Sequence, residues 1–484
     1  MKKTVSLVAG VLAAVIAASA AGIAIGASTR AGPSVANLAL INGVIEIVQR
    51  DYVHTVTSDE LTTDALKGML TRLDPHSDYM DEAEFKESQS DLNGRFGGLG
   101  IQISTQDGVP KIISPIDDTP ASRAGLAGGD LIVAIDGEST HGIDLQKIVR
   151  ILRGTPGTSV KLTILRGTKA PFDVAITRAI IEVPSIKAKL QPNGIGYVRV
   201  TEFGGETADD FRKAVEKLKQ DAGGKLRGLV IDLRNNPGGL LSAAISISGN
   251  FLDGGTVVST RGRRRTEDHS YSAPARGDLL PGVPIVVLIN GASASASEIV
   301  SGALQDRHRA TIMGTPSFGK GSVQSVIPLS GHGALRLTTA LYYTPAGRSI
   351  QGEGITPDVV VEAPKDQQVA GALLLSENEL SGAFKNPGRL GGQTKNDAQK
   401  VPSPAKASPA AAHSAPIKAD LIGSDQDAQL KAAIAQLEQA NGCGGTRASA
   451  NGSVVNGAGA NPCPKQPAQP QPAPKPGEPQ PAHP

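Results

Sequence analysis

The sequence predicts an α/β core, preceded by an inserted mostly β domain and an N-terminal helical segment and followed by a disordered Pro-rich tail. Three observations predict this class. Strands and helices alternate from about residue 195, which is typical of an α/β sheet. Residues 96–182 hold five short β-like runs separated by glycine turns. Beyond about residue 364 Pro, Ala and Gln dominate and the hydrophobic periodicity stops.

The composition limits both the domain count and the class of partner. The 484 residues suggest roughly two to four domains. The chain has 48 basic and 46 acidic side chains, a net charge of +2. This balance argues against a nucleic-acid binder, because such proteins usually carry a strong basic excess.

Residues 1–28 are interpreted as a signal peptide or a membrane anchor. Lys2 and Lys3 precede an apolar run of 19 residues, 7–25, which contains the cleavage pattern Ala18-Ser19-Ala20. A run of this length also suffices to span a bilayer. No cysteine stands at its end, so a lipoprotein anchor is not predicted. We expect export to the periplasm or cell envelope, with cleavage or inner-membrane anchoring as the alternatives.

Residues 35–95 are predicted to be helical. The stretch VANLALINGVIEIVQRDYV has apolar residues at a spacing of three to four. A second helix is expected to start at Ser58 and to place four apolar residues on one face: Leu66, Met69, Leu70 and Leu73.

The mostly β domain, residues 96–182, is built from the predicted strands GLGIQIST, PKIISPI, DLIVAIDG, SVKLTILRG and PFDVAITRA. A helix is expected over Asp144–Leu152.

The α/β core spans residues 183–362. Its predicted strands are GIGYVRV, LRGLVIDLR, VPIVVLIN and ATIMGTP, and its helices are ETADDFRKAVEKLKQ, GLLSAAISISGNF and SASEIVSGALQD. The continuous apolar runs LVIDL and IVVLI are typical of strands buried on both faces. Two further strands, VQSVIPLS and ALRLTTALYYTP, close the core.

The C-terminal part is divided by one amphipathic segment. Residues 363–417 are predicted to be a low-complexity linker, residues 418–441 a helix that docks on the body, and residues 442–484 a Pro-rich tail. Cys443 and Cys463 both lie in this part, and we expect them to close one loop in an oxidising compartment.

Lys320 lies in GTPSFGKGS, which is one residue away from a phosphate-binding loop. Gly321 occupies the position of the required hydroxyl, and a predicted strand follows where a helix should begin. Nucleotide binding is therefore not expected. The alternatives are a solvated turn lysine and a general base. A base must be neutral, so burial would have to lower its pKa by roughly 3 from about 10.4, which costs on the order of 4 kcal/mol.

A candidate nucleophile comes from NGASASASE, where Ser293, Ser295 and Ser297 stand at a strand-to-helix transition. Helix capping is the common reason for serine at such a place. Three serines alternating with alanine exceed that need, and the small neighbours let another backbone approach. None of the eight histidines stands in an evident triad context. His308 is the nearest in sequence and is interpreted as a surface residue.

Six motifs in order resemble the C-terminal processing peptidases, or tail-specific proteases, which are Ser-Lys serine endopeptidases with an inserted PDZ domain. The motifs are LDPHSDYM, GGLGIQI, DLRNNPGGLL, NGASASASEIVSGALQD, GTPSFGKGSVQ and TPAGRSIQGEGITPDVVV. They cover roughly residues 36–362. The resemblance implies an α/β protease core of this type.

The resemblance also implies the roles of individual residues. It implies Ser295 as the nucleophile, Lys320 as the base 25 positions further on, and Gln324 as the residue that positions the lysine. The backbone amides of Gly238 and Ala296 are implied as the oxyanion hole, with Gly239 as the less favoured choice. No metal or other cofactor is implied.

The β domain then corresponds to the PDZ domain. Its carboxylate-binding loop falls on four residues: Gly98, Leu99, Gly100 and Ile101. This assignment is supported by the downstream pattern DTPASRAGLAGGDLIVAIDGE. The implied function is that of an exported serine endopeptidase that binds the C-terminal tails of protein substrates. The alternative is a peptide-binding PDZ scaffold with little or no proteolytic activity. A homodimer and an adaptor protein are further partners that the resemblance allows. The basic cluster at 261–265 is interpreted as a solvated loop, with an acidic partner or membrane surface as the alternative.

Overall fold

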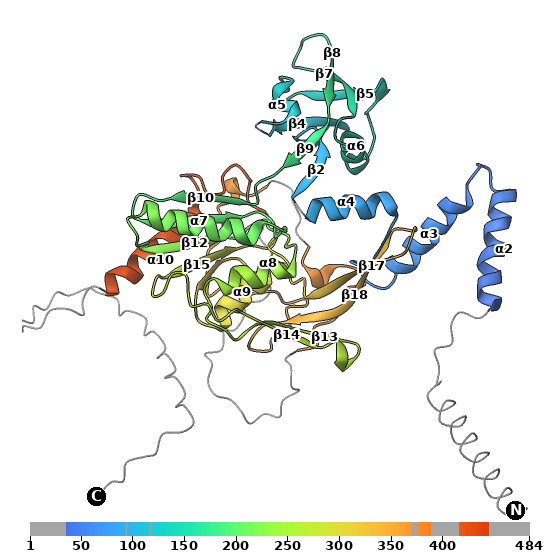
Figure 1. Cartoon of the computed structure of the whole chain (residues 1–484). Coiled ribbons are helices and arrows are strands. Elements are labelled where there is room, and N and C mark those ends of the chain that lie inside the picture. The colour runs from blue at the N-terminus through green and yellow to red at the C-terminus, as the bar shows by residue number, and fades with distance from the viewer. Residues whose placement is uncertain (1–34, 93, 117, 370–374, 389–415, 445–484) are drawn as a thin grey trace, which may run out of the picture.

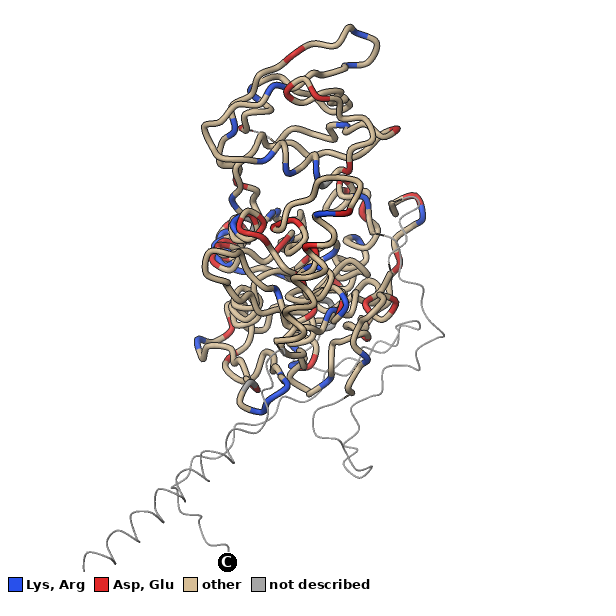
Figure 2. The backbone as a smooth tube through the Cα atoms, turned by 90° about the vertical axis from the view of Figure 1, so that its right-hand side faces the viewer, with Lys and Arg blue, Asp and Glu red and all other residues tan. Residues whose placement is uncertain are grey.

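The structure is a computed structural model of the whole chain. It describes five ranges: 35–92, 94–116, 118–369, 375–388 and 416–444. The predicted signal or anchor segment and the Pro-rich tail with Cys463 lie outside the described residues, so the cleavage, anchoring and disulfide hypotheses stay predictions. Lys and Arg are interspersed with Asp and Glu along the backbone (Figure 2).

The predicted α/β core is confirmed, with a six-stranded sheet at its centre (Figure 1). In spatial order the strands are β10 (Ile186–Leu190), β11 (Ile195–Val200), β12 (Gly228–Asp232), β15 (Ile285–Ile289), β16 (Thr311–Gly314) and β19 (Val359–Val360). Only the edge strand β10 runs antiparallel to its neighbour, and the other pairs are parallel.

Helices cover both faces of this sheet, as the continuous apolar runs predict. They are α7 (Thr207–Asp221), α8 (Leu241–Gly249) and α9 (Ala296–Asp306) on one face and α10 (Ala428–Gly444) on the other. Side chains along β12 alternate between the two cores. Leu229 and Ile231 join the cluster with α7, α8 and α9, whereas Val230 packs with Leu437 of α10. Burial on both faces fixes the register of the central strands.

A second sheet lies on the far side of α8 and α9. Its strands are β1 (Asp78–Met80), β18 (Ala334–Tyr343), β13 (Thr256–Gly262) and β14 (His269–Ser272), with β17 (Ser322–Pro328) also paired to β18. β13 packs against both helices. The turn between β13 and β14 contains the one-turn helix η1 (Arg265–Glu267), and three arginines of the predicted basic cluster are exposed there: Arg263, Arg264 and Arg265.

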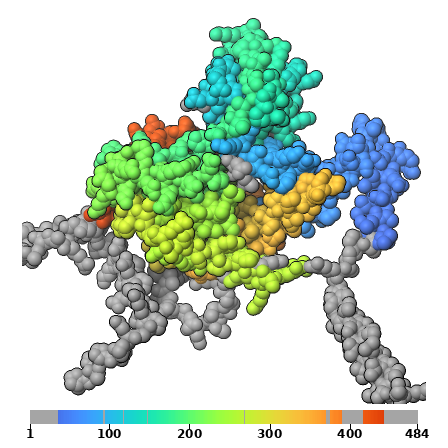
Figure 3. Space-filling model, in the orientation of Figure 1, coloured from blue at the N-terminus to red at the C-terminus, as the bar shows by residue number. Residues whose placement is uncertain are grey.

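The inserted mostly β domain is confirmed and forms a separate lobe above the core (Figure 3). Its strands are β3 (Ile101–Gln106), β4 (Val109–Pro115), β5 (Leu131–Ile135), β6 (Glu138–Ser139), β7 (Ser159–Leu165) and β8 (Phe172–Thr177), and its helices are α5 (Pro120–Arg123) and α6 (Leu145–Leu152). β2 (Arg95–Gly98) pairs with β9 (Ala179–Glu182). These two strands connect the lobe to the rest of the chain (Figure 1).

The N-terminal part contains α2 (Val35–Asp51), α3 (Ser58–Thr71) and α4 (Glu82–Leu92). α2 has no buried residue and projects away from the body (Figure 3). On the predicted apolar face of α3, only Leu70 is buried, and Met69 and Leu73 are 57% and 54% exposed. Among the described residues, no helix has the length and apolar character needed to cross a membrane.

The C-terminal part differs from its prediction in two places. The predicted linker 363–417 contains ordered segments, including η2 (Lys365–Gln367) and η3 (Glu377–Glu379), whose Glu377 is fully buried. The docked helix is present but starts at Ala428 rather than at 418. The cause is Asp427, whose carboxylate accepts a hydrogen bond from the Leu430 N–H at 3.0 Å and so caps the helix.

Candidate active site

Ser295 stands at the turn between β15 and α9 with an unusual backbone conformation. Its φ is 54° and its ψ is −111°, a backbone conformation that residues other than glycine rarely adopt. Such a residue costs of order 1–3 kcal/mol and is often found at a functional site. The chain keeps this strained serine at the start of a helix, directly before the buried Ala296.

The other two serines of the cluster have structural partners. The hydroxyl of Ser293 donates to the Leu233 carbonyl at 2.8 Å, and that of Ser297 donates to the Asn236 carbonyl at 3.0 Å. Both serines are fully buried, whereas Ser295 is only half-buried. The geometry therefore singles out Ser295 as the serine available to a substrate.

Relieving the strain at Ser295 should raise stability while removing activity. We expect Ser295→Gly to be more stable than Ser295→Ala by about 1 kcal/mol, because glycine adopts a positive φ without a steric penalty. Both variants should lack peptidase activity. Urea unfolding of the two proteins measures the difference, and an equal or lower stability of Ser295→Gly would show that the turn is unstrained.

Lys320 lies in the connection between β16 and β17, next to the serine turn. The N–H groups of Ser295 and Lys320 donate to the same oxygen, Oε2 of Glu298, at 2.7 and 2.9 Å. The two backbone nitrogens are thus at most about 5.6 Å apart, the sum of those distances. A strand follows Lys320, so the helix that a phosphate loop requires is not there.

The environment of Lys320 favours the neutral amine. Burial lowers the pKa of the Lys320 ammonium, and the nearby cation of Arg336 lowers it further, while the carboxylates of Glu377, Glu298 and Asp74 act in the opposite direction. Ser295 and Lys320 each donate from the backbone N–H to Glu298. Among the described residues, Nζ of Lys320 forms no hydrogen bond, either with the Ser295 hydroxyl or with another acceptor. Such catalytic contacts often tighten only when substrate is bound.

Gln324 lies on a polar chain that leads to a buried carboxylate. Its Nε2 donates to Oγ of Ser322 at 3.0 Å and to Oγ1 of Thr338 at 3.3 Å. The Thr338 hydroxyl in turn donates to Oδ1 of Asp74 at 3.0 Å. Within the described part of the chain, no hydrogen bond joins Gln324 to Lys320, so its positioning role stays a prediction.

The turn after β12 lies directly against the serine. A Cβ added to Gly238, whose φ is 105°, would lie 2.8 Å from Cβ of Ser295 and 3.0 Å from N of Ala296. The N–H of Gly238 donates to Oδ1 of Asn236 at 2.9 Å. The Ala296 N–H has no acceptor among the described residues. One of the two predicted oxyanion donors is therefore engaged within the protein.

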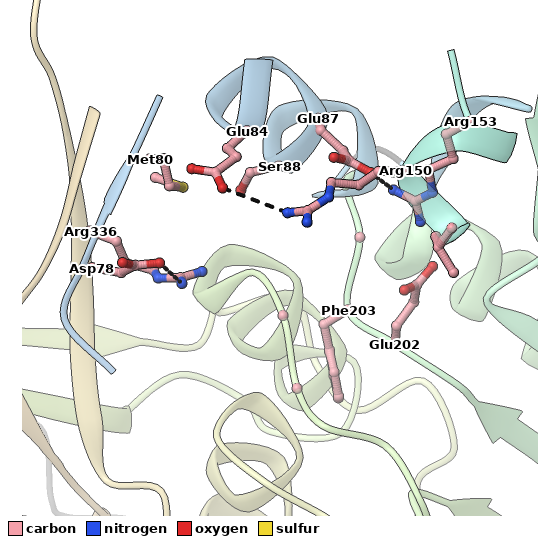
Figure 4. A pocket seen from close by; sticks show the side chains of 14 residues that line it. Asp78, Met80, Glu84, Glu87, Ser88, Arg150, Arg153, Glu202, Phe203 and Arg336 are labelled. Atoms are coloured by element: carbon pink, nitrogen blue, oxygen red, sulfur yellow. Dashed lines mark hydrogen bonds and ion pairs between the residues drawn. The ribbon is translucent and has the colours of Figure 1, made fainter. Parts of the chain in front are cut away.

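A cavity of about 630 Å³ connects this turn with the inserted domain. It is lined by residues of the turn, the segment after β11, the N-terminal part, α6 with the residue after it, and β18: Gly238, Gly239, Glu202, Phe203, Gly204, Asp78, Met80, Glu84, Glu87, Ser88, Val149, Arg150, Arg153 and Arg336. Glu87 of α4 pairs with Arg153, the residue after α6, at 2.7 Å, and Glu84 faces Arg150 of α6 at 3.9 Å (Figure 4). The cavity is large enough for several residues of an extended peptide.

The inserted domain has an open edge at the predicted carboxylate loop. β3 is the first strand of its sheet and, within the described residues, is paired only with β4. The loop before it is held by the N–H groups of Ile116 and Ala121, which donate to the carbonyls of Gly100 and Leu99 at 2.8 and 2.9 Å. Gly98 ends β2 and Ile101 begins β3. A peptide can therefore add as a strand beside β3 with its carboxylate at the loop.

Several residues near Lys320 were not found from the sequence. The half-buried His76 and the fully buried Glu377 form a pair at 2.8 Å, although they are 301 positions apart. Glu298 and Asp74 also face the lysine. LDPHSDYM and SASE contain three of these residues, but only the folded chain brings them to one place.

Comparison with known proteins identifies the class. Residues 194–361 match the model of peptidase family S41, residues 111–166 match the PDZ domain, and residues 17–84 match the N-terminal domain of the activating protease CtpB. The carboxy-terminal-processing protease of Bartonella bacilliformis is 49% identical over 351 residues, which cover 72% of this chain and 80% of that protein. The chain therefore belongs to peptidase family S41.

Within that family the chain is a carboxy-terminal processing protease with a PDZ domain, as the sequence predicted. The carboxy-terminal processing protease CtpB of Bacillus subtilis is 34% identical over 381 residues, 75% of this chain and 78% of that protein. Among solved structures, the photosystem II D1 C-terminal processing protease is 28% identical, with a TM-score of 0.42 over 66% of this chain and 88% of that one. Membership of a protease family supports the enzyme over the alternative of a peptide-binding scaffold.

Proposed function

We propose that this chain is an exported endopeptidase that captures the C-terminal tails of proteins with its PDZ domain and cleaves peptide bonds with Ser295 and Lys320. The observation that carries the proposal is the shared contact of both backbones with Oε2 of Glu298 beside a half-buried lysine whose pKa is lowered. The cavity that extends from the Gly238 turn to α6 gives a bound tail a path from one domain to the other.

In the proposed reaction, Oγ of Ser295 attacks the scissile carbonyl carbon while its proton passes to Nζ of Lys320. The N–H groups of Ala296 and Gly238 donate to the developing oxyanion, which is usually worth several kcal/mol. The C–N bond then breaks, and the Lys320 ammonium returns its proton to the leaving amine. Water, deprotonated by the same lysine, hydrolyses the acyl-enzyme and regenerates Ser295.

The proposal makes one demand on the oxyanion turn. Gly238 must exchange Oδ1 of Asn236, its acceptor at 2.9 Å, for the substrate oxygen. Gln324 is proposed to position Lys320 through the chain of hydroxyls that ends at Asp74.

Cleavage of an unstructured peptide with a free C-terminus tests this function. Ser295→Ala should reduce kcat by at least about 10³-fold, while the affinity of the PDZ domain for the same peptide stays unchanged. Ser293→Ala, which alters a neighbouring structural hydroxyl, serves as the matched control and should keep measurable activity. Undiminished cleavage by Ser295→Ala would exclude Ser295 as the nucleophile.

Export is supported by the charged and apolar character of residues 1–28. The mass of the mature N-terminus, together with cell fractionation, distinguishes a cleaved signal from an uncleaved inner-membrane anchor. A cytosolic protein with an intact N-terminus would contradict export.

A further inference from the structure

Glu298, three residues after Ser295, is a carboxylate with no exposed surface. It accepts four hydrogen bonds from two separate segments of the chain. Oε2 accepts from the N–H groups of Ser295 at 2.7 Å and Lys320 at 2.9 Å. Oε1 accepts from the Ser317 hydroxyl and from the Gly319 N–H, both at 2.6 Å. One side chain thus bonds both to the serine turn and to the lysine loop.

Helix capping explains only the first of these contacts. A glutamate at the third helical position often accepts from the N–H of the cap residue. Glu60 does this in α3, where its Oε2 accepts from N and Oγ1 of Thr57 at 2.8 and 2.9 Å. The contacts of Glu298 with Ser317, Gly319 and Lys320 reach 19 to 22 positions along the chain. Capping requires none of them.

The four donors favour the ionised form of the Glu298 carboxylate. The three N–H groups can only donate, and the Ser317 hydroxyl, which accepts from the Ile355 N–H at 2.7 Å, donates to Oε1. An ionised carboxylate has about four acceptor sites, which matches the four donors around Glu298. Burial raises the pKa of Glu298 to about 7, and the donated bonds oppose that rise.

The residues around Glu298 are closely packed and leave its carboxylate little room to move. A Cβ added to Gly354, whose φ is 65°, would lie 2.6 Å from Oγ of Ser317 and 3.1 Å from Oε1 of Glu298. The lysine loop is also fixed from behind, because the Phe318 N–H donates to the Ser293 carbonyl at 3.0 Å. Glu298 and this backbone bond therefore both hold the lysine loop against the serine turn, and Glu298 is the side chain that contacts Ser295 and Lys320 directly.

We propose that Glu298 is a positioning residue that holds the Ser295 turn and the Lys320 loop at the separation required for proton transfer. This inference rests on the proposed Ser295–Lys320 chemistry and adds a residue to it. Glu298 touches neither the substrate nor the reacting atoms. It acts through the backbone of both.

The test compares two substitutions of Glu298, one that removes the negative charge and one that shortens the side chain. Glu298→Gln keeps the size but turns an NH₂ group toward two donors, so the turn and the loop move apart. We expect kcat to fall about 10²-fold, the effect of a misplacement on the order of 1 Å, while KM stays within about 3-fold. Glu298→Asp keeps the charge but cannot reach both segments, so kcat should fall as well. Glu60→Gln alters an exposed capping glutamate and should leave kcat unchanged.

The acid limb of the pH profile of kcat/KM gives a readout that a purely structural role would not move. Lys320 is faced by the carboxylates of Glu298, Glu377 and Asp74 and by the cation of Arg336. Removing the charge of Glu298 makes protonation of Lys320 less favourable, so the acid limb of Glu298→Gln should shift to lower pH. Glu298→Asp retains the charge, and its acid limb should stay close to that of the wild type.

Ser317 supplies a second test should the Glu298 variants fail to fold. Ser317→Ala removes one donor to Oε1 and should lower kcat about 10-fold, whereas Ser317→Thr keeps the hydroxyl and should restore it to within about 3-fold. The inference is overturned by wild-type kcat in Glu298→Gln, by an unmoved acid limb in that variant, or by equal activity of the two Ser317 variants. None of these results touches the loss of cleavage expected for Ser295→Ala, so the inference can fail while the proposed function stands.

Discussion

Replacing Lys320 by alanine should reduce kcat for peptide cleavage by at least about 10³-fold, with little change in the binding of the tail by the PDZ domain. General-base catalysis contributes typically 10²–10⁴-fold, and Lys320 is the proposed base in two successive steps. Its burial beside Arg336 lowers the pKa of the ammonium. Below that pKa the lysine is protonated and cannot accept a proton, so activity should fall on the acid side.

Two controls separate the base from a structural lysine. Lys320→Arg keeps a cation that cannot be deprotonated in proteins and should be as inactive as Lys320→Ala. A small primary amine added to Lys320→Ala should restore part of the lost rate, because it can occupy the vacated space as a neutral base. Substantial activity in Lys320→Arg would contradict the proposed mechanism.

Replacing Arg234 by methionine should destabilise the core by about 3–5 kcal/mol, the typical cost of breaking a buried ion pair. Arg234 is fully buried between Asp232 and Asp427. Its guanidinium donates to both carboxylates and to Oε1 of Gln429 at 3.0 Å. Without the cation, two carboxylates would face each other in the core.

The expected loss is large because Arg234 joins distant parts of the chain. Its partner Asp427 precedes α10. Asn235, the residue after Arg234, donates from its side chain to the Ile417 carbonyl at 2.7 Å. The C-terminal segment thus supports the turn that contains Gly238. Urea unfolding measures the change. Lys217→Met, which breaks an exposed pair with Asp221, is the control and should cost no more than about 1 kcal/mol. A similarly small effect in Arg234→Met would show that the buried network contributes little.

The sequence was sufficient to predict those elements whose apolar pattern matches their burial in the fold. LVIDL and IVVLI became β12 and β15 because strands buried on both faces need apolar residues throughout. The small residues around Ser295 predicted a close approach of another backbone, and the Gly238 turn lies there.

The sequence was insufficient where the contacts join segments far apart in the chain. Glu377 lies in a stretch predicted to be a linker, yet it is fully buried and paired with His76 near Lys320. Neither residue has a periodic pattern that would mark it. The acceptor of the Gly238 N–H, Asn236, depends on the local turn conformation, which residue types alone do not fix.

The charge state of Lys320 tests the central claim most directly. Its pKa can be measured by NMR titration of the ε-methylene signals in Ser295→Ala, with the Lys320 resonance assigned by comparison with Lys320→Arg. A buried general base predicts a pKa below about 10.4, the value of an exposed lysine, and an amine that is neutral where the wild type is active. A Lys320 that titrates like a surface lysine, in a protein whose wild type cleaves peptide at neutral pH, would contradict it.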